Sequence, residues 1–149
     1  MSGGRPRVRP RVASIVIQDG AVLVQRPVDD PKASYAFVGG EYEVGDTLLS
    51  RLQTEFEEET NCRIVRAEYL FVVENRFEYE GRLIHGLEHY FYVEINRHDV
   101  ESREPHLSFH WVSLDTLAEH DVRPHVVRDV IVSGELRDVR HLVVPYQDT

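Results

Sequence analysis

The feature that most constrains the fold is an acid-rich segment, residues 39–62, with the sequence GGEYEVGDTLLSRLQTEFEEETNC. Its first half holds three glycines and is expected to form a loop, after which Asp46 or Thr47 can cap a helix. At 100° per residue, that helix has a narrow apolar stripe formed by Leu49, Leu52 and Phe56. The neighbouring arc carries three carboxylates, those of Glu55, Glu58 and Glu59.

Carboxylates gathered on one arc repel each other unless water, a partner or a cation neutralises them. Mg²⁺ prefers oxygen ligands, keeps several waters, and commonly joins one or two carboxylates to the phosphates of a substrate. A rigid helix edge that follows an acidic loop suits this role. The segment therefore indicates a divalent-cation site, and a solvated acidic helix end is the alternative interpretation.

The whole segment resembles the Nudix box, the signature of the Nudix hydrolase family. In the family pattern a glycine is followed after five residues by an acid, and then after seven by Arg-Glu-aliphatic-any-Glu-Glu-any-Gly-aliphatic. Gly40 opens the pattern in this chain, and Asp46 takes the first acidic position. The later positions are matched without a gap by Glu55, Phe56, Glu58, Glu59 and Cys62.

Three positions depart from the family pattern. Asp46 is shorter than the usual glutamate, Thr54 stands in place of the arginine, and Asn61 in place of the second glycine. Asparagine tolerates the left-handed conformation that ends many helices, so Asn61 is a mild change. The family's arginine usually pairs with a box glutamate and orients it. Thr54 therefore bears on the level of activity and not on the fold.

The resemblance implies an α+β fold, a Nudix-like α/β/α sandwich in which a mixed sheet lies between helices and the box loop and helix are central. It also implies a metal-dependent hydrolase that cleaves a diphosphate linkage in a nucleoside diphosphate derivative, with Mg²⁺ as the cation and Mn²⁺ as the alternative. The metal-binding set it implies comprises Gly40, Glu55, Glu58 and Glu59. Glu55 and Glu58 count as catalytic, and Glu58 or Glu88 would accept the proton of the attacking water. The expected substrate-binding residues are Arg26, Phe37 and Glu43.

Length and charge limit the classes of function. A chain of 149 residues is one domain with a real core, and we expect a flexible basic arm over residues 1–11 before a single hydrolase domain over residues 12–149. The net charge of −9 argues against binding to nucleic-acid polymers, whereas small phosphorylated ligands remain open. No apolar run has the length of a membrane span, so no membrane partner is expected. A single cysteine, Cys62, fits a reducing cytoplasm, and the sequence leaves open whether the chain forms a homodimer.

Hydrophobic patterns and turn residues predict most of the remaining elements. The expected strands are residues 12–17, 21–25, 35–38, 63–74, 77–79, 83–95 and 107–112, with a further short strand at 142–144. The expected hairpin turns are Asp19-Gly20 and Glu80-Gly81. Two helices are expected near the C-terminus, over residues 114–120 and from Pro124 to Gly134.

Some polar residues outside the box are weaker candidates. Glu88 lies on a strand that the resemblance places beside the box helix, where it would be a further metal ligand or a general base; a glutamate facing water is the alternative. Glu74 and Glu78 rank below it. His85 and His89 would share one face of a strand about 13 Å apart, which is too far for one zinc ion.

The substrate follows only by elimination. The chain has no proline between Cys62 and Pro105, which disfavours ADP-ribose within the family, and the accessory motifs of the coenzyme A and dinucleoside-polyphosphate subgroups are not found. A nucleoside triphosphate or another small nucleotide is therefore the default substrate. The base would stack on one of three aromatic side chains: Tyr35, Phe37 or Phe77. The alternative function is a Nudix-like module that binds or senses a nucleotide or nucleotide sugar with little turnover.

Overall fold

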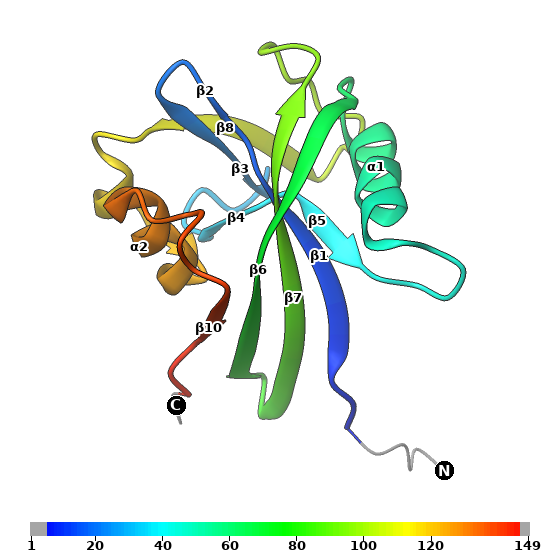
Figure 1. Ribbon diagram of the computed structural model, residues 1–149, viewed down its shortest axis with the longest axis vertical. Helices are drawn as coiled ribbons and strands as arrows, with labels where there is room; N and C mark the ends of the chain where they lie inside the picture. The colour runs from blue at the N-terminus through cyan, green and yellow to red at the C-terminus, as the bar shows by residue number, and fades with distance from the viewer. Residues whose placement is uncertain (1–5, 147–149) are drawn as a thin grey trace.

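The computed structural model describes residues 6–146. In this part of the chain ten strands form two small sheets, and two α-helices pack against them (Figure 1). The first sheet has the strand order β10-β6-β7-β1-β5. Its strands are β1 (Arg9–Ile15), β5 (Gly39–Glu41), β6 (Ile64–Tyr79), β7 (Arg82–Ile95) and β10 (His141–Val143). Because β1 pairs with β7 in parallel and with β5 antiparallel, this sheet is mixed.

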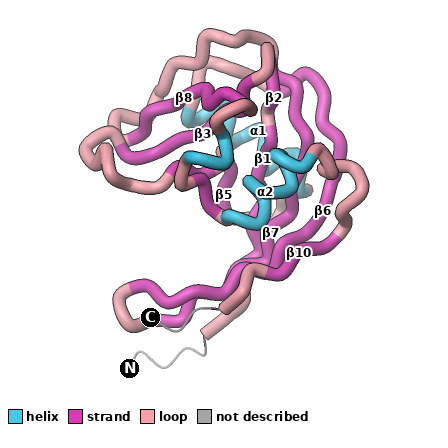
Figure 2. Tube along the Cα trace, turned by 90° about the vertical axis from the view of Figure 1, so that its left-hand side faces the viewer, coloured by secondary structure: helices cyan, strands magenta, loops and turns pink. Residues whose placement is uncertain are grey.

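The second sheet is also mixed. Its strand order is β2-β3-β4-β9, and β8 lies off this path and pairs with β3. Its strands are β2 (Ile17–Gln18), β3 (Ala21–Pro27), β4 (Tyr35–Ala36), β8 (Leu107–Ser113) and β9 (Val122–Arg123). In the tube view of Figure 2 the β6–β7 hairpin extends beyond the rest of the molecule. The strands of this hairpin meet at Glu80-Gly81, where both residues have positive φ, as a two-residue hairpin turn requires.

The two helices cover opposite sides of the strands (Figure 1). Helix α1 (Leu48–Glu59) begins at Thr47, whose side chain accepts a hydrogen bond from the Ser50 backbone N–H while the Ser50 hydroxyl accepts one from Thr47 N–H. Helix α2 (His125–Ser133) ends at Gly134, which has a φ of 77°. A short 3₁₀ turn, η1 (Leu117–Glu119), precedes β9.

Each helix seals its own part of the core. The apolar stripe of α1 buries Leu52 and Phe56 completely against a cluster that includes Val12, Val38 and Phe91. Helix α2 closes the other cluster, whose largest buried members are Phe71 and Tyr90. The α+β sandwich of mixed strands between helices is therefore confirmed, with α1 held in place by packing.

The structure changes several details of the sequence prediction. Strand β1 begins at Arg9, so the last part of the predicted basic arm is paired strand instead, because its backbone bonds to β7; residues 1–5 of the arm lie outside the described residues. The two strands predicted over residues 63–79 form the single strand β6. In place of the helix predicted over residues 114–120, the structure has only the short 3₁₀ turn η1. Cys62 is buried. No helix within residues 6–146 is long and apolar enough to cross a membrane.

Candidate active site

The loop and helix of the box meet at Gly40, on the edge strand β5. A Cβ atom at Gly40 would lie 2.3 Å from Glu55 Oε1, so only glycine lets this carboxylate pack against the strand. The preceding Gly39 also leaves no room for a side chain, because a Cβ atom there would lie 2.2 Å from the Val12 carbonyl oxygen on β1. Gly39 is therefore required for the close approach of β5 to β1, and Gly40 leaves the space that the Glu55 carboxylate occupies.

Glu55 and Glu59, one turn apart on α1, share a hydrogen bond between their side chains. Burial, the charge of Glu55 and this hydrogen bond raise the pKa of Glu59 to about 8. Burial also raises the pKa of Glu55, against the opposing charge of Arg51. Glu59 Oε2 is buried and has no hydrogen-bond partner among the residues that the structure describes. Two carboxyl groups that share a proton, with one oxygen left without a hydrogen-bond partner in the described chain, lack a nearby cation that would stabilise both as carboxylates.

This donor set fits a hard divalent cation, which would replace the shared proton and satisfy the orphaned oxygen. Glu58 lies on the same arc, and its side chain is 61% exposed, so packing does not fix its rotamer. Within residues 6–146, no three His, Cys, Asp or Glu side chains already stand in a metal-ligating arrangement. The guanidinium of Arg51 lies among these carboxylates, with its Nη2 atom 3.7 Å from Glu58 Oε1.

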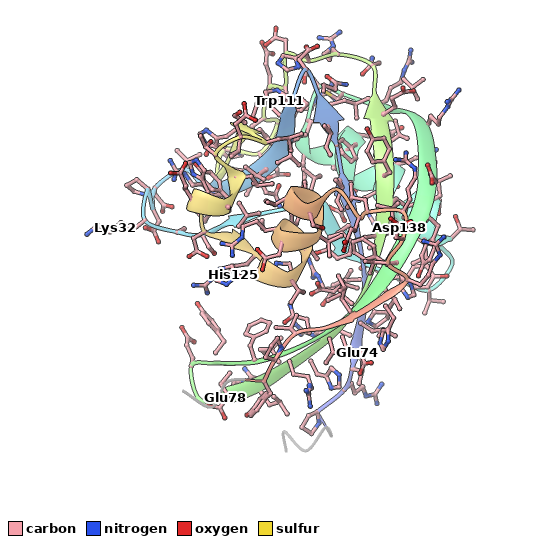
Figure 3. All side chains as sticks on the ribbon, turned by 60° about the vertical axis from the view of Figure 1, so that its left-hand side comes forward. Lys32, Glu74, Glu78, Trp111, His125 and Asp138 are labelled. Atoms are coloured by element: carbon pink, nitrogen blue, oxygen red, sulfur yellow. The ribbon has the colours of Figure 1, made fainter. Side chains whose placement is uncertain are left out.

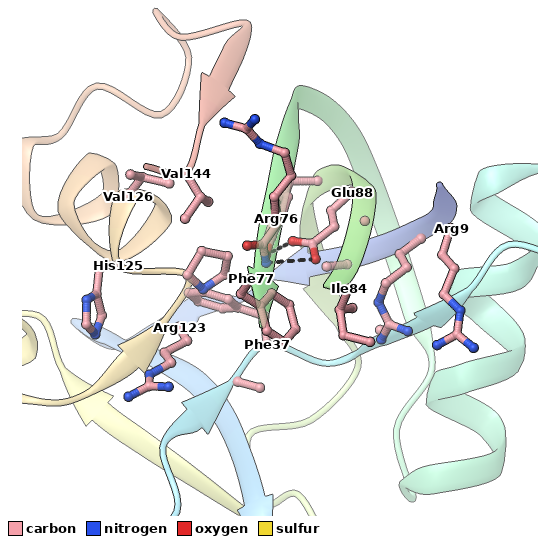
Figure 4. Close-up of a pocket in the computed structure, with 18 of the residues that line it drawn as sticks. Arg9, Phe37, Arg76, Phe77, Ile84, Glu88, Arg123, His125, Val126 and Val144 are labelled. Carbon is pink, nitrogen blue, oxygen red and sulfur yellow. Dashed lines mark hydrogen bonds between the residues drawn. The ribbon is translucent and has the colours of Figure 1, made fainter. Parts of the chain in front are cut away.

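A pocket of about 830 Å³ adjoins the box at Gly39. It lies between β1, the β6–β7 hairpin and the start of α2 (Figure 4), and this volume is typical of small-molecule sites. Two phenylalanines line it: Phe37, almost fully buried, and Phe77, which is 41% exposed. Four arginines also line it, Arg9, Arg11, Arg76 and Arg123.

Glu88 lies in the wall of this pocket, on β7. It accepts hydrogen bonds from Asn75 Nδ2 at 3.2 Å and from the Tyr90 hydroxyl at 3.4 Å (dashed lines in Figure 4). Burial raises the pKa of Glu88, while the two hydrogen bonds and the charge of Arg11 oppose the rise. The pocket wall thus holds a carboxylate and an amide side by side, one accepting and the other donating hydrogen bonds.

Arg11 connects the pocket and the box electrostatically. It is opposite Glu88 in the β1–β7 pairing and opposite Glu41 in the β1–β5 pairing. Its positive charge opposes the burial-driven rise in the pKa of both Glu55 and Glu88. No carboxylate of the described chain comes within 4 Å of its guanidinium. Arg11 is thus available to an anion that lies between the box and the pocket.

The structure brings some predicted residues to this site and leaves others apart. Gly40, Glu55, Glu58 and Glu59 gather at the box, while Phe37 and Glu88 line the pocket. Glu43 lies in the box loop, 2.8 Å from Arg51. Arg26 is outside the pocket lining; it donates to the Pro31 carbonyl and lies over the Tyr35 ring.

The weaker candidates have other partners. Glu74 Oε2 lies 2.6 Å from His141 Nε2. Glu78 accepts a hydrogen bond from the Tyr146 hydroxyl at 3.2 Å. Both glutamates lie on β6 (Figure 3). His89 Nδ1 is 2.9 Å from the Tyr69 hydroxyl, and burial lowers the pKa of His89. These contacts explain the residues without a bound ligand.

Comparison with known proteins agrees with the geometry. The chain matches the NUDIX domain over residues 7–130, and it therefore belongs to the Nudix family. A search of curated proteins finds no match. Nudix hydrolases in general use divalent metal ions and act on small nucleotide-type substrates, and this chain is a Nudix-type pyrophosphohydrolase.

Several solved structures share its fold. A MutT protein from Bacillus halodurans has a TM-score of 0.70 at 18% identity, over 91% of this chain and 87% of that one. A MutT protein from Methanosarcina mazei Go1 has a TM-score of 0.68 at 17% identity, over 93% and 100%. A MutT NUDIX hydrolase from Burkholderia pseudomallei has a TM-score of 0.63 at 21% identity, over 73% and 85%. At these identities the likeness establishes the fold.

Proposed function

We propose that this enzyme hydrolyses a diphosphate linkage in a nucleoside triphosphate or another small nucleotide, with Mg²⁺ or Mn²⁺ as the cation. The observation that supports this proposal is that the pocket and the box carboxylates meet at two consecutive glycines. Gly39 lines the pocket, and Gly40 contacts Glu55. A nucleotide with its base and sugar in the pocket would therefore direct its phosphates toward the carboxylates.

Glu55, Glu58 and Glu59, together with Gly40, would hold the cation. When bound, it would supply positive charge against the diphosphate oxygens, whose repulsion otherwise resists a nucleophile. Glu59 contributes its orphaned oxygen, and Glu55 is fixed by its contact with Gly40. The buried edge of α1 thereby presents oxygen ligands from a rigid element.

The other residues act on the substrate itself. Glu58, as the exposed carboxylate of the box, accepts the proton of the attacking water. Arg11 binds a phosphate between the two halves of the site. Glu88, the other candidate base, is fixed by Asn75 and Tyr90 in the pocket wall, which suits it to orienting the substrate. Phe37 and Phe77 provide apolar walls for the base.

A substrate screen tests this proposal. Nucleoside triphosphates, nucleotide sugars, ADP-ribose and dinucleotides are each incubated with Mg²⁺ or Mn²⁺, and phosphate or pyrophosphate release is measured. We expect turnover of triphosphates, and we expect Glu58→Gln and Glu59→Gln to reduce it by orders of magnitude while the melting temperature at pH 5 changes little. Glu57→Gln, an exposed change on the same helix, is the matched control and should retain activity. Release of AMP from ADP-ribose with triphosphates untouched would contradict the assigned substrate.

The second candidate function is a module that binds or senses a nucleotide without turning it over. The observation that favours it is Thr54, whose hydroxyl donates to the Ser50 carbonyl at 3.0 Å and does not orient a carboxylate. Thr54→Arg separates the two functions. If the natural chain and this variant both lack activity while nucleotide binding persists without Mg²⁺, the binding module is the correct function.

A further inference from the structure

One guanidinium holds the acidic loop and the acidic helix together. Arg51 Nη1 lies 2.8 Å from Glu43 Oε2 and 3.5 Å from Asp46 Oδ2, both in the loop. On the helix, Arg51 Nε is 3.4 Å from Glu55 Oε1 and Nη2 is 3.7 Å from Glu58 Oε1. The Arg51 side chain is only 11% exposed, and Asp46 and Glu55 are largely buried too, so solvent screens these two contacts less than it screens ordinary surface ion pairs. The contacts with Glu43 and Glu58, whose side chains are exposed, are screened more.

Helix geometry explains how Arg51 reaches these carboxylates. Residues 51, 55 and 58 are separated by four and three positions, so they share one face of α1. Residue 54 is on the same helix, but the Thr54 hydroxyl is bonded to the Ser50 carbonyl. The positive charge next to Glu55 and Glu58 therefore comes from Arg51, one helical turn before position 54.

The box loop depends on this contact because few apolar groups anchor it. Tyr42 is exposed, Val44 is fully exposed, and Gly45 has a φ of +96°. The loop's acidic side chains pair instead with Arg51. A hydrogen bond from Asp46 N–H to the Glu43 carbonyl closes only the local turn. Arg51 thus positions the loop as well as the two helix glutamates.

Arg51 leaves the carboxylates able to take a cation. It contacts four carboxylates with a single positive charge, and Glu59 is outside its contacts. The Nε–H of Arg51 is buried and makes no hydrogen bond within the described chain, so its contact with Glu55 is an ion pair only. Glu59 Oε2, which also has no hydrogen-bond partner in the described chain, therefore remains available to a metal ion.

We propose that Arg51 is the positioning residue of this active site and performs, from one turn earlier on the helix, the role that an arginine at position 54 performs in the family pattern. The inference rests on the proposed metal-dependent hydrolysis at the same carboxylates. A planar fork of donors suits this role, and lysine, with a compact ammonium, is a poor replacement. Groups that orient metal ligands typically change metal affinity or activity about 10- to 100-fold when they are removed.

The test compares Arg51→Gln, Arg51→Lys, Thr54→Arg and the double variant Arg51→Gln/Thr54→Arg. Two quantities are measured: the Mn²⁺ dissociation constant of the nucleotide-free protein by calorimetry, and kcat at saturating Mg²⁺. Arg51→Gln should weaken Mn²⁺ binding and lower kcat, each by about 10-fold or more, and Arg51→Lys should recover little. The double variant should recover most of both losses. Arg137→Gln, which removes an exposed ion pair with Glu68, is the control and should change neither.

Three results would overturn the inference. Tighter Mn²⁺ binding by Arg51→Gln with unchanged kcat would mean that Arg51 only competes with the cation. Unaltered values of both quantities would mean that the ion pairs do not position the carboxylates. Failure of the double variant to recover Mn²⁺ affinity would refute the equivalence with position 54. If Arg51→Gln does not fold, as judged by thermal unfolding, Arg51→Lys carries the same comparison. If the natural chain binds Mn²⁺ but hydrolyses no nucleotide, the proposed function fails while the Mn²⁺ measurements still decide the role of Arg51.

Discussion

Glu59 gives the site a measurable effect on the stability of the metal-free protein. Its pKa is about 8 in the folded chain against an ordinary value of 4.5, because burial and the neighbouring Glu55 disfavour its charge. Between these two values the folded protein holds a proton that the unfolded chain has released. The free energy of unfolding therefore falls as the pH rises from about 4.5 to about 8.

The size of this loss follows from the shift and from exposure. Each pH unit in the window costs at most about 1.4 kcal/mol, which gives an upper bound of about 5 kcal/mol. Glu59 is only partly buried, so solvent screening reduces the expected loss to about 1–2 kcal/mol. Glu59→Gln keeps the size of the side chain and a donor toward Glu55 but cannot ionise. We therefore expect this variant to be more stable than the natural chain at pH 8.5 and nearly equal to it at pH 5.

The assay measures the free energy of unfolding of the natural chain and of Glu59→Gln in urea, at pH 5, 7 and 8.5 in the presence of a chelator. All other ionisable groups are the same in both proteins, so the difference between the two proteins isolates Glu59. Glu57→Gln, on the exposed side of the same helix, should show no such pH-dependent difference. If Glu59→Gln and the natural chain lose the same stability between pH 5 and 8.5, the carboxyl of Glu59 titrates normally and the argument for a charge-deficient pair is wrong.

Two further substitutions test the packing of the site. Gly40→Ala places a Cβ 2.3 Å from Glu55 Oε1 and should displace that carboxylate, lowering kcat/KM about 10-fold or more with a small change in melting temperature; unchanged kcat/KM would refute the contact. Phe56→Ala removes a fully buried ring from the core beneath α1 and should lower the free energy of unfolding by about 3–5 kcal/mol in urea, whereas the exposed Gln53→Ala should cost about 0.5 kcal/mol or less. A loss below about 1 kcal/mol for Phe56→Ala would show that α1 does not close the core.

The sequence predicts elements well wherever a local signal is strong. Thr47 caps the box helix, Gly134 ends the last helix, and two-residue turns with positive φ occur at Asp19-Gly20 and Glu80-Gly81. Each of these signals needs only neighbouring residues. The sequence does not predict the start of β1 at Arg9, because Pro disfavours strands and only the long-range pairing with β7 supplies the stabilisation.

The pocket depends on strand register, which no local pattern contains. Arg11 and Glu88 become neighbours only because β1 pairs in parallel with β7, and Asn75 meets Glu88 only in the β6–β7 register. The sequence therefore could not connect these three residues. Arg51 is different, since its spacing of four from Glu55 is a recognisable helical ion pair. The family pattern places its orienting arginine at position 54, so it does not single out Arg51.

The charge around the proposed nucleotide site matters more for ligand binding than the net charge of the chain. The whole chain carries −9, and two of the four arginines that line the pocket are already paired, Arg9 with Glu41 at 3.4 Å and Arg123 with Asp121 at 3.1 Å, which leaves Arg11 and Arg76 for an anion. At physiological ionic strength, charges more than about 8 Å away are largely screened. A small nucleotide inside the pocket would therefore interact mainly with the groups of the pocket lining, such as Arg11 and Arg76, and little with the net charge of the whole chain. A nucleic-acid polymer would extend beyond the pocket and meet the acidic surface along its length, so the charge distribution favours small phosphorylated ligands over polymers.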